Sequence, residues 1–87
     1  MELITPKYIK RFILRALLRL KGIPWPDALL EESVRNGIVP RPLLSDIHEA
    51  KRELEQTGYI QGNRDDLDGE VTWTLTVKGR HRAVELD

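Results

Sequence analysis

The sequence contains no cysteine, few aromatic residues and no excess of charge of either sign. Without cysteine the chain has no disulfide framework, no thiolate zinc site and no cysteine nucleophile. Its 14 Lys and Arg residues balance its 14 Asp and Glu residues, so no net charge draws it toward nucleic acid or an anionic membrane. We expect the 87 residues to form a single domain, residues 1–87, that is too small for a deep cofactor cleft.

Long hydrophobic runs are also absent, because Lys or Arg interrupts the apolar stretches every few residues. No segment is apolar for long enough to cross a bilayer, and residues 1–20 lack the apolar core and cleavage site of a secretory signal. We therefore expect no membrane association and a cytoplasmic location. A hydrophobic fraction of 40% with 32% charged residues is typical of a folded protein.

Apolar residues recurring every three or four positions predict a first helix over about residues 6–21. Thr5 is suited to cap this helix and Pro6 to occupy its first position. Successive steps of about 100° place Leu14 and Leu18 nearly opposite the main apolar stripe. A helix that is apolar on two sides usually has a partner on each, so these leucines predict a homodimer seam or a groove for another protein.

Two more helices are expected, each after a rigid link that contains proline. The second covers Asp27–Asn36, and its inward residues are Ala28, Leu29, Leu30 and Val34. The third starts either at Pro42 or with Ser45 as its cap, and it ends at residues 57–58.

The hydrophobic period then changes from that of a helix to that of a strand. Residues 59–61 predict a short strand, residues 63–69 are rich in turn formers, and residues 70–76 alternate apolar side chains with threonines. This pattern predicts a β-hairpin with one apolar face. A short last helix is expected over residues 77–86, although Gly79 weakens it near its start.

Two motifs flank the predicted hairpin. Residues 53–60 read Glu-Leu-Glu-Gln-Thr-Gly-Tyr-Ile, and residues 73–80 read Trp-Thr-Leu-Thr-Val-Lys-Gly-Arg. They resemble the two junctions of the wing in winged helix-turn-helix proteins, among them many small bacterial and phage repressors. The resemblance covers about residues 5–86. It implies an α+β fold with three N-terminal helices, a two-stranded β-hairpin wing and a short C-terminal helix.

In the DNA-binding members of this superfamily the third helix enters the major groove, while the wing touches the backbone or the minor groove. The resemblance therefore implies a small transcriptional regulator or phage accessory protein that binds double-stranded DNA. The implied DNA contacts are Ser45, His48, Glu49, Lys51, Arg52 and Gln56 on the third helix, Asn63 and Arg64 on the wing, and Lys10 and Arg11 on the first helix. Arg52 is suited to guanine and Gln56 to adenine.

The distribution of charge departs from the pattern of many DNA-binding relatives. Residues 42–57 carry more acidic than basic side chains, and Arg64 stands beside several carboxylates in the wing turn. Residues 6–21, in contrast, hold six basic residues and no acidic one. Winged helices also serve as protein-interaction modules. The alternative function is therefore an interaction or dimerisation module that uses Leu14 and Leu18 and binds no DNA.

No catalytic or metal-binding arrangement is visible in the sequence. The acidic turn does not fit a calcium-binding loop, because aligning Gly69 with the loop glycine places Arg64 and Leu75 at ligand positions. His48 and His81 lack the spacing of zinc ligands. We expect no enzymatic activity, no metal and no cofactor.

Overall fold

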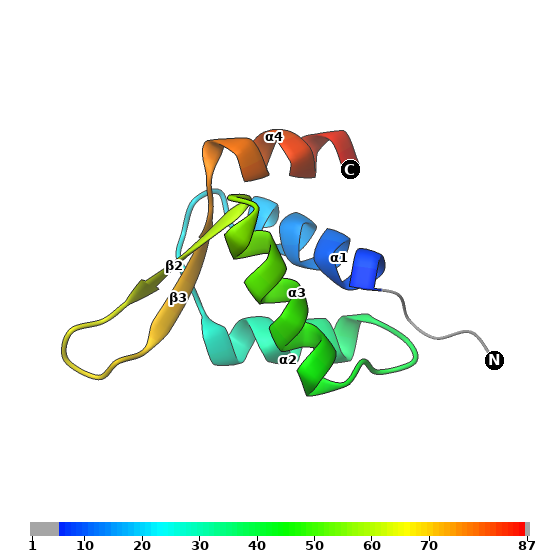
Figure 1. Cartoon of the computed structure of the whole chain (residues 1–87), viewed down its shortest axis with the longest axis horizontal. Helices are drawn as coiled ribbons and strands as arrows, with labels where there is room; N and C mark the ends of the chain where they lie inside the picture. Colours follow the sequence, from blue (N-terminus) through cyan, green and yellow to red (C-terminus); the bar gives the residue numbers. More distant parts are fainter. Residues whose placement is uncertain (1–5, 87) are drawn as a thin grey trace.

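Four helices and three strands follow one another within residues 6–86, the part of the chain that the computed structural model describes. In chain order they are α1 (Pro6–Arg19), β1 (Trp25–Pro26), α2 (Asp27–Gly37), α3 (Leu44–Gln56), β2 (Ile60–Arg64), β3 (Val71–Leu75) and α4 (Val77–Leu86) (Figure 1). The α+β winged-helix arrangement predicted from the sequence is confirmed. Thr5, the predicted cap of the first helix, lies outside the described residues.

The described strands form one antiparallel sheet in the order β1-β3-β2. The hairpin pairs Ile60 with Leu75 at its base and Arg64 with Val71 near its tip, so β2 is longer than the strand predicted at residues 59–61. The sequence predicted only an extended link where β1 lies. This short segment pairs with β3 at the sheet edge, a position that tolerates Pro26 because an edge strand has no second neighbour to receive an N–H.

The core lies where α1, α2 and α3 meet the sheet. Its largest fully buried side chains are Ile9, Ile13, Leu30, Val34, Ile47 and Ile60. The prediction that Ala28 and Leu29 also face inward is wrong, because both are exposed. Leu30 and Val34 stand one turn apart and define the single stripe that α2 buries, and the helical rotation turns the two preceding residues away from it.

The third helix begins at Leu44, between the two predicted starting points. The backbone of Leu43 is extended, and its carbonyl oxygen accepts hydrogen bonds from the amides of Asp46 and Ile47. Ser45 therefore lies inside the helix and does not cap it. The end of α3 agrees with the prediction, because Gly58 follows it with a φ of 84°, which glycine adopts without strain.

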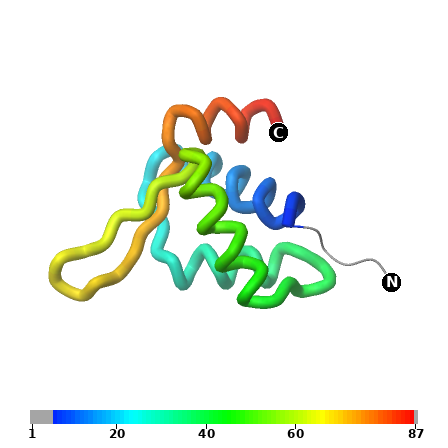
Figure 2. Tube along the Cα trace, viewed as in Figure 1, coloured from blue at the N-terminus to red at the C-terminus, as the bar shows by residue number. Residues whose placement is uncertain are grey.

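The last helix, α4, packs along α1 (Figures 1 and 2). It covers the second apolar side of α1, where Leu14 is only 3% exposed and Leu18 packs half-buried against the core. The second apolar side of α1, which the sequence analysis predicted, therefore has a partner within the same chain. Within residues 6–86, no helix has the length and apolar character needed to span a bilayer.

The start of α4 lies very close to the chain that joins α3 to β2. The Thr76 hydroxyl accepts a hydrogen bond from the Gly79 amide at 3.0 Å and donates to the Gly58 carbonyl at 2.5 Å. A Cβ atom at Gly79 would lie 1.8 Å from the carbonyl oxygen of Tyr59. Glycine therefore permits the contact that attaches α4 to the rest of the fold.

Candidate nucleic-acid interface

The outer face of α3 presents a row of exposed polar side chains: Ser45, Glu49, Arg52 and Gln56. The sequence predicted this row, and the helix brings its members onto one side. Arg52 is 66% exposed at its side chain, and its Nη2 atom is 3.8 Å from Oε1 of Glu49. Such an exposed pair contributes at most a few tenths of a kcal/mol, so Arg52 can turn toward a ligand at little cost.

A buried polar network fastens the other side of α3 to α2 and to the wing. Lys51 is 5% exposed, and its Nζ donates to Oδ1 of Asp27 at 2.5 Å and to Oε1 of Glu31 at 2.9 Å. Trp73 of β3 donates from Nε1 to the same Asp27 oxygen at 2.6 Å. Asp27 therefore joins the start of α2, the middle of α3 and the wing strand.

The network changes the expected roles of two predicted DNA contacts. Lys51 points into the protein rather than toward solvent, and His48 is 57% exposed but lies 2.6 Å from Oε1 of Glu31. The sequence contained a signal for this arrangement. Asp27 and Glu31 stand one turn apart on α2, so their two carboxylates lie side by side and would be stabilised by a cation. Lys51 follows the buried Ile47 by one turn and therefore lies near the buried side of α3.

The carboxyl groups of Asp27 and Glu31 both have a lowered pKa. Burial alone would raise the pKa of each. The hydrogen bonds from Lys51 and its charge outweigh burial, with a further hydrogen bond from Trp73 to Asp27 and from His48 to Glu31. Both groups therefore stay ionised in the folded protein to lower pH than in the unfolded chain.

We expect the free energy of unfolding to fall as the pH drops below about 4, the usual carboxyl pKa in an unfolded chain. The stabilisation from a lowered pKa is complete above that value and is lost as the pH falls through the lower pKa of the folded state. Urea unfolding followed by tryptophan fluorescence, from about pH 7 down to about pH 2, measures this loss. Asp27→Asn should flatten the dependence on pH, whereas an unchanged slope would contradict the assignment.

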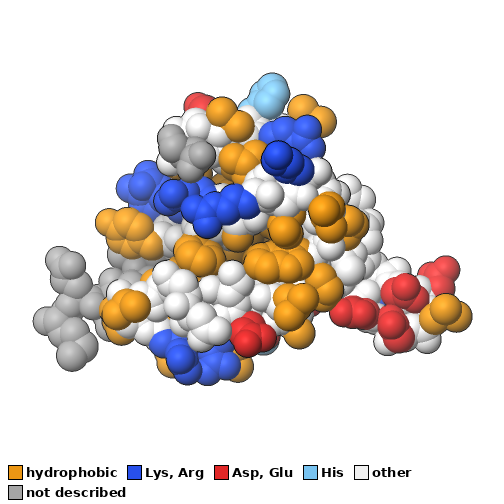
Figure 3. Space-filling model, turned by 180° about the vertical axis from the view of Figure 1, so that it is seen from behind, with side chains coloured by type: hydrophobic (Ala, Val, Ile, Leu, Met, Phe, Trp, Pro, Cys, Tyr) orange, Lys and Arg blue, Asp and Glu red, His pale blue; other side chains and the backbone are white. Residues whose placement is uncertain are grey.

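The wing residues Asn63 and Arg64 are exposed at the end of β2. Nη1 of Arg64 donates to the Gly69 carbonyl at 3.3 Å, so the guanidinium is folded onto the turn. Carboxylates crowd this turn, and Figure 3 shows them as an acidic cluster at the hairpin end: Asp65, Asp66, Asp68 and Glu70. No group of histidine, aspartate or glutamate side chains in residues 6–86 is arranged to hold a metal ion.

The basic residues of α1 do not extend the face of α3. Figure 3 shows Lys and Arg side chains gathered over α1 on the side opposite to the view of Figure 1, where α3 lies in front. Nζ of Lys10 is 2.8 Å from Oε2 of Glu53 on α3, and Arg11 lines a groove between α1 and α4. Lys10 therefore lies beside α3 as the partner of Glu53, whereas Arg11 lines the groove and not the exposed row of α3.

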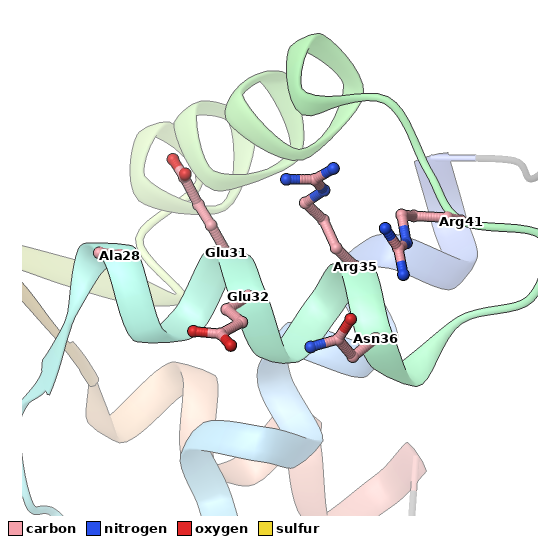
Figure 4. A pocket seen from close by; sticks show the side chains of 6 residues that line it. All are labelled: Ala28, Glu31, Glu32, Arg35, Asn36 and Arg41. Carbon is pink, nitrogen blue, oxygen red and sulfur yellow. The ribbon is translucent and has the colours of Figure 1, made fainter.

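Two further arginines, which the sequence interpretation missed, flank a pocket of about 370 Å³ between α2 and the segment that leads into α3. In Figure 4, Arg35 extends from α2 toward α3, and Arg41 projects from that segment. Nε of Arg35 is buried and has no hydrogen-bond partner within residues 6–86. Guanidinium groups beside the first turn of a helix are suited to an anion such as a phosphate. Both arginines lie outside any basic run, so the sequence pattern did not reveal them.

Comparisons with known proteins support the fold. No family model matches the sequence, and no curated protein matches it significantly. The structure is similar to smu.1704 from Streptococcus mutans UA159, with a TM-score of 0.78 and 16% identity over 98% of this chain and 77% of that one. It is also similar to SSV1 F-93, with a TM-score of 0.70 and 23% identity over 99% of this chain and 86% of that one.

A third similar structure is that of a Bacillus cereus ATCC 10987 protein described as a MarR-like transcription regulator. The TM-score is 0.72 and the identity 22%, over 92% of this chain and 52% of that one. This chain thus spans about half the length of the regulator. The agreement in arrangement at such low identity establishes the winged helix-turn-helix fold, whereas function must be argued from the site.

Proposed function

We propose that the protein binds double-stranded DNA as a small transcriptional regulator or phage accessory protein, with α3 in the major groove. The observation that carries this proposal is the exposed row on α3, where Arg52 and Gln56 stand one turn apart. An arginine can bind O6 and N7 of guanine, and a glutamine can bind N6 and N7 of adenine. The similarity of fold to a MarR-like transcription regulator supports the same role for α3.

Contacts on the other sides of α3 hold the helix, and with it the exposed row that includes Arg52 and Gln56, in a fixed position. Lys51 bonds α3 to Asp27 and Glu31 on α2, while Glu53 pairs with Lys10 on α1. A recognition helix fixed on both sides loses less entropy when it binds, so more of its contact energy appears as affinity. In this proposal Lys51 positions the helix and does not contact DNA itself.

Arg35 and Arg41 are our candidates for the main phosphate contacts. Arg41 lies three residues before α3 begins, where a helix N-terminus also favours a phosphate, and Arg35 lines the same pocket together with Glu31 and Glu32. The acidic hairpin tip would repel the backbone, so in this proposal only Asn63 and Arg64, at the end of β2, contribute from the wing. Lys10, which pairs with Glu53, and Arg11, which lines the groove between α1 and α4, would add long-range attraction.

Arg52→Ala is expected to lower affinity for the preferred site about 5- to 150-fold, because a bidentate base contact contributes about 1–3 kcal/mol. The preferred site is first selected by the wild-type protein from random duplexes. Fluorescence anisotropy at about 50 mM salt then measures binding. Arg82→Ala is the matched control, since Arg82 forms a similar exposed pair with Glu85 at 3.8 Å, but on α4.

The double variant Arg35→Ala with Arg41→Ala should weaken binding to all sequences alike. Removing two phosphate contacts should make the slope of log affinity against log salt shallower by about 2. No duplex binding by the wild type at micromolar concentration would contradict the proposed function. The alternative, an interaction module built on an exposed pair of Leu14 and Leu18, is not supported, because Leu14 is only 3% exposed and merely edges the groove between α1 and α4.

A further inference from the structure

A groove of about 270 Å³ lies between α1 and α4. Leu14 and Leu86 contribute to its apolar floor together with Leu54 and Tyr59 from α3 and the segment after it. Its rim is basic: Lys7, Lys10, Arg11 and Arg82. The basic residues of the rim come from the first half of α1 and the second half of α4. Figure 1 shows both halves at the end of the molecule opposite to the hairpin tip.

Among residues 6–86, acidic side chains balance only part of the positive charge of this rim. Lys10 pairs closely with Glu53, and Arg82 lies 3.8 Å from Glu85 in an exposed pair. No ion pair joins Lys7 or Arg11 to an acidic residue among those that the structure describes. The groove therefore combines an apolar floor with unneutralised cations, a pattern that favours an apolar group flanked by carboxylates.

The hairpin tip, at the other end of the molecule, carries that complementary pattern. Leu67 is 96% exposed, and acidic residues of the turn flank it in the sequence; Figure 3 shows acidic side chains gathered at this end of the hairpin. The turn is ordered by its own aspartates, since Asp65 accepts a hydrogen bond from the Leu67 amide at 2.7 Å and Asp68 accepts one from the Glu70 amide at 2.8 Å. A preorganised turn loses little conformational entropy when it docks.

We propose that the hairpin tip of one copy docks into the α1–α4 groove of a second copy. Leu67 would lie on the apolar floor, and Asp65, Asp66 and Asp68 would face Lys7 and Arg11. The tip and the groove lie at opposite ends of the longest dimension of the molecule, so the tip of one chain cannot reach the groove of the same chain (Figure 1).

The proposed contact joins two different surfaces, so a single contact leaves one tip and one groove open. Such a head-to-tail contact adds further copies instead of stopping at a symmetric dimer. A single turn buries much less than the ~800 Å² per partner of a standard interface, so we expect weak association that depends on charge. The contact also gives the acidic wing a role that does not require DNA, and it is independent of the proposed function.

Sedimentation velocity of the full chain tests the proposal with two complementary variants. The tip variant is Leu67→Asp, and the groove variant is Lys7→Glu with Arg11→Glu. The average mass of the wild type should rise with concentration beyond that of a dimer and should fall in about 0.5 M salt, where charges are screened. Each variant alone should associate at least about ten-fold more weakly than the wild type, because one half of the contact is lost.

The mixture of the two variants gives the decisive result. One intact groove in the tip variant meets one intact tip in the groove variant, so the mixture should form a 1:1 heterodimer and stop there. Val84→Asp, which changes an exposed apolar residue of α4 that does not line the groove, should associate like the wild type. Circular dichroism checks that every variant is folded.

Three outcomes would overturn the proposal. A wild type that stays monomeric up to about 1 mM, well above the micromolar range of weak interfaces, would exclude the contact and leave the groove to another ligand. A wild type that stops at a dimer would indicate a symmetric interface. A mixture of folded variants that forms no heterodimer would show that the tip and the groove do not meet.

Discussion

Gly79→Ala is expected to destabilise the protein by more than about 3 kcal/mol, although alanine is the better helix former. The added Cβ would lie 1.8 Å from the carbonyl oxygen and 2.8 Å from the carbonyl carbon of Tyr59. That carbonyl accepts the Thr76 amide at 3.1 Å at the base of the hairpin, so it cannot move without breaking the sheet. The clash would instead lift α4 from α1 and expose Leu14.

Urea unfolding of the variant and of the wild type measures this loss. Arg80→Ala is the matched control, because it makes a substitution at the next, exposed position of α4 and should change stability by less than about 0.5 kcal/mol. Helix propensity alone would make Gly79→Ala stabilising by about 1 kcal/mol. A variant as stable as the wild type would therefore show that the contact with Tyr59 does not hold α4.

Gly79 illustrates what the sequence could predict and what it could not. The period of apolar residues located the helices and the hairpin, because that period records which side of each element is buried. The sequence also predicted a helix over residues 77–86, and it identified Gly79 only as a weakness within that helix. The reason for the glycine is a contact with Tyr59, a residue of a different element. Local helix propensity cannot predict a contact between residues that are far apart in the sequence.

The same limit explains the errors in the candidate site. The spacing of Leu14 and Leu18 correctly indicated a second partner for α1, but only the position of α4 shows that this partner belongs to the same chain. Helical rotation placed Arg52 and Gln56 outward without difficulty. Lys51 lies at the edge of the buried stripe, where rotation alone does not separate a solvent-facing cation from one that enters a network. Its partners on α2 are 20 and 24 residues away.

Asp27→Ala is the second substitution with a large expected effect, a loss of about 2–4 kcal/mol. It would leave the buried Lys51 with one carboxylate, Glu31, and remove the acceptor of the Trp73 indole N–H. Removing one partner of a buried pair costs about 3–5 kcal/mol because the remaining charge is uncompensated. The Asp27 side chain is 36% exposed, so water can enter and recover part of this loss. Urea unfolding measures the change in the free energy of unfolding.

Combining Asp27→Ala with Lys51→Met separates the charge from the packing. Methionine retains much of the lysine stem without its charge, so the double variant should lose at least about 1 kcal/mol less than the sum of the two single losses. The matched comparison is the exposed pair of Glu49 and Arg52, for which the same cycle with two alanines should give a coupling below about 0.5 kcal/mol. Equal coupling in the two pairs would contradict the network as the element that holds α3. With α3 held by Lys51 in this way, Asp27→Ala should also weaken the proposed DNA binding, although Asp27 does not belong to the exposed row.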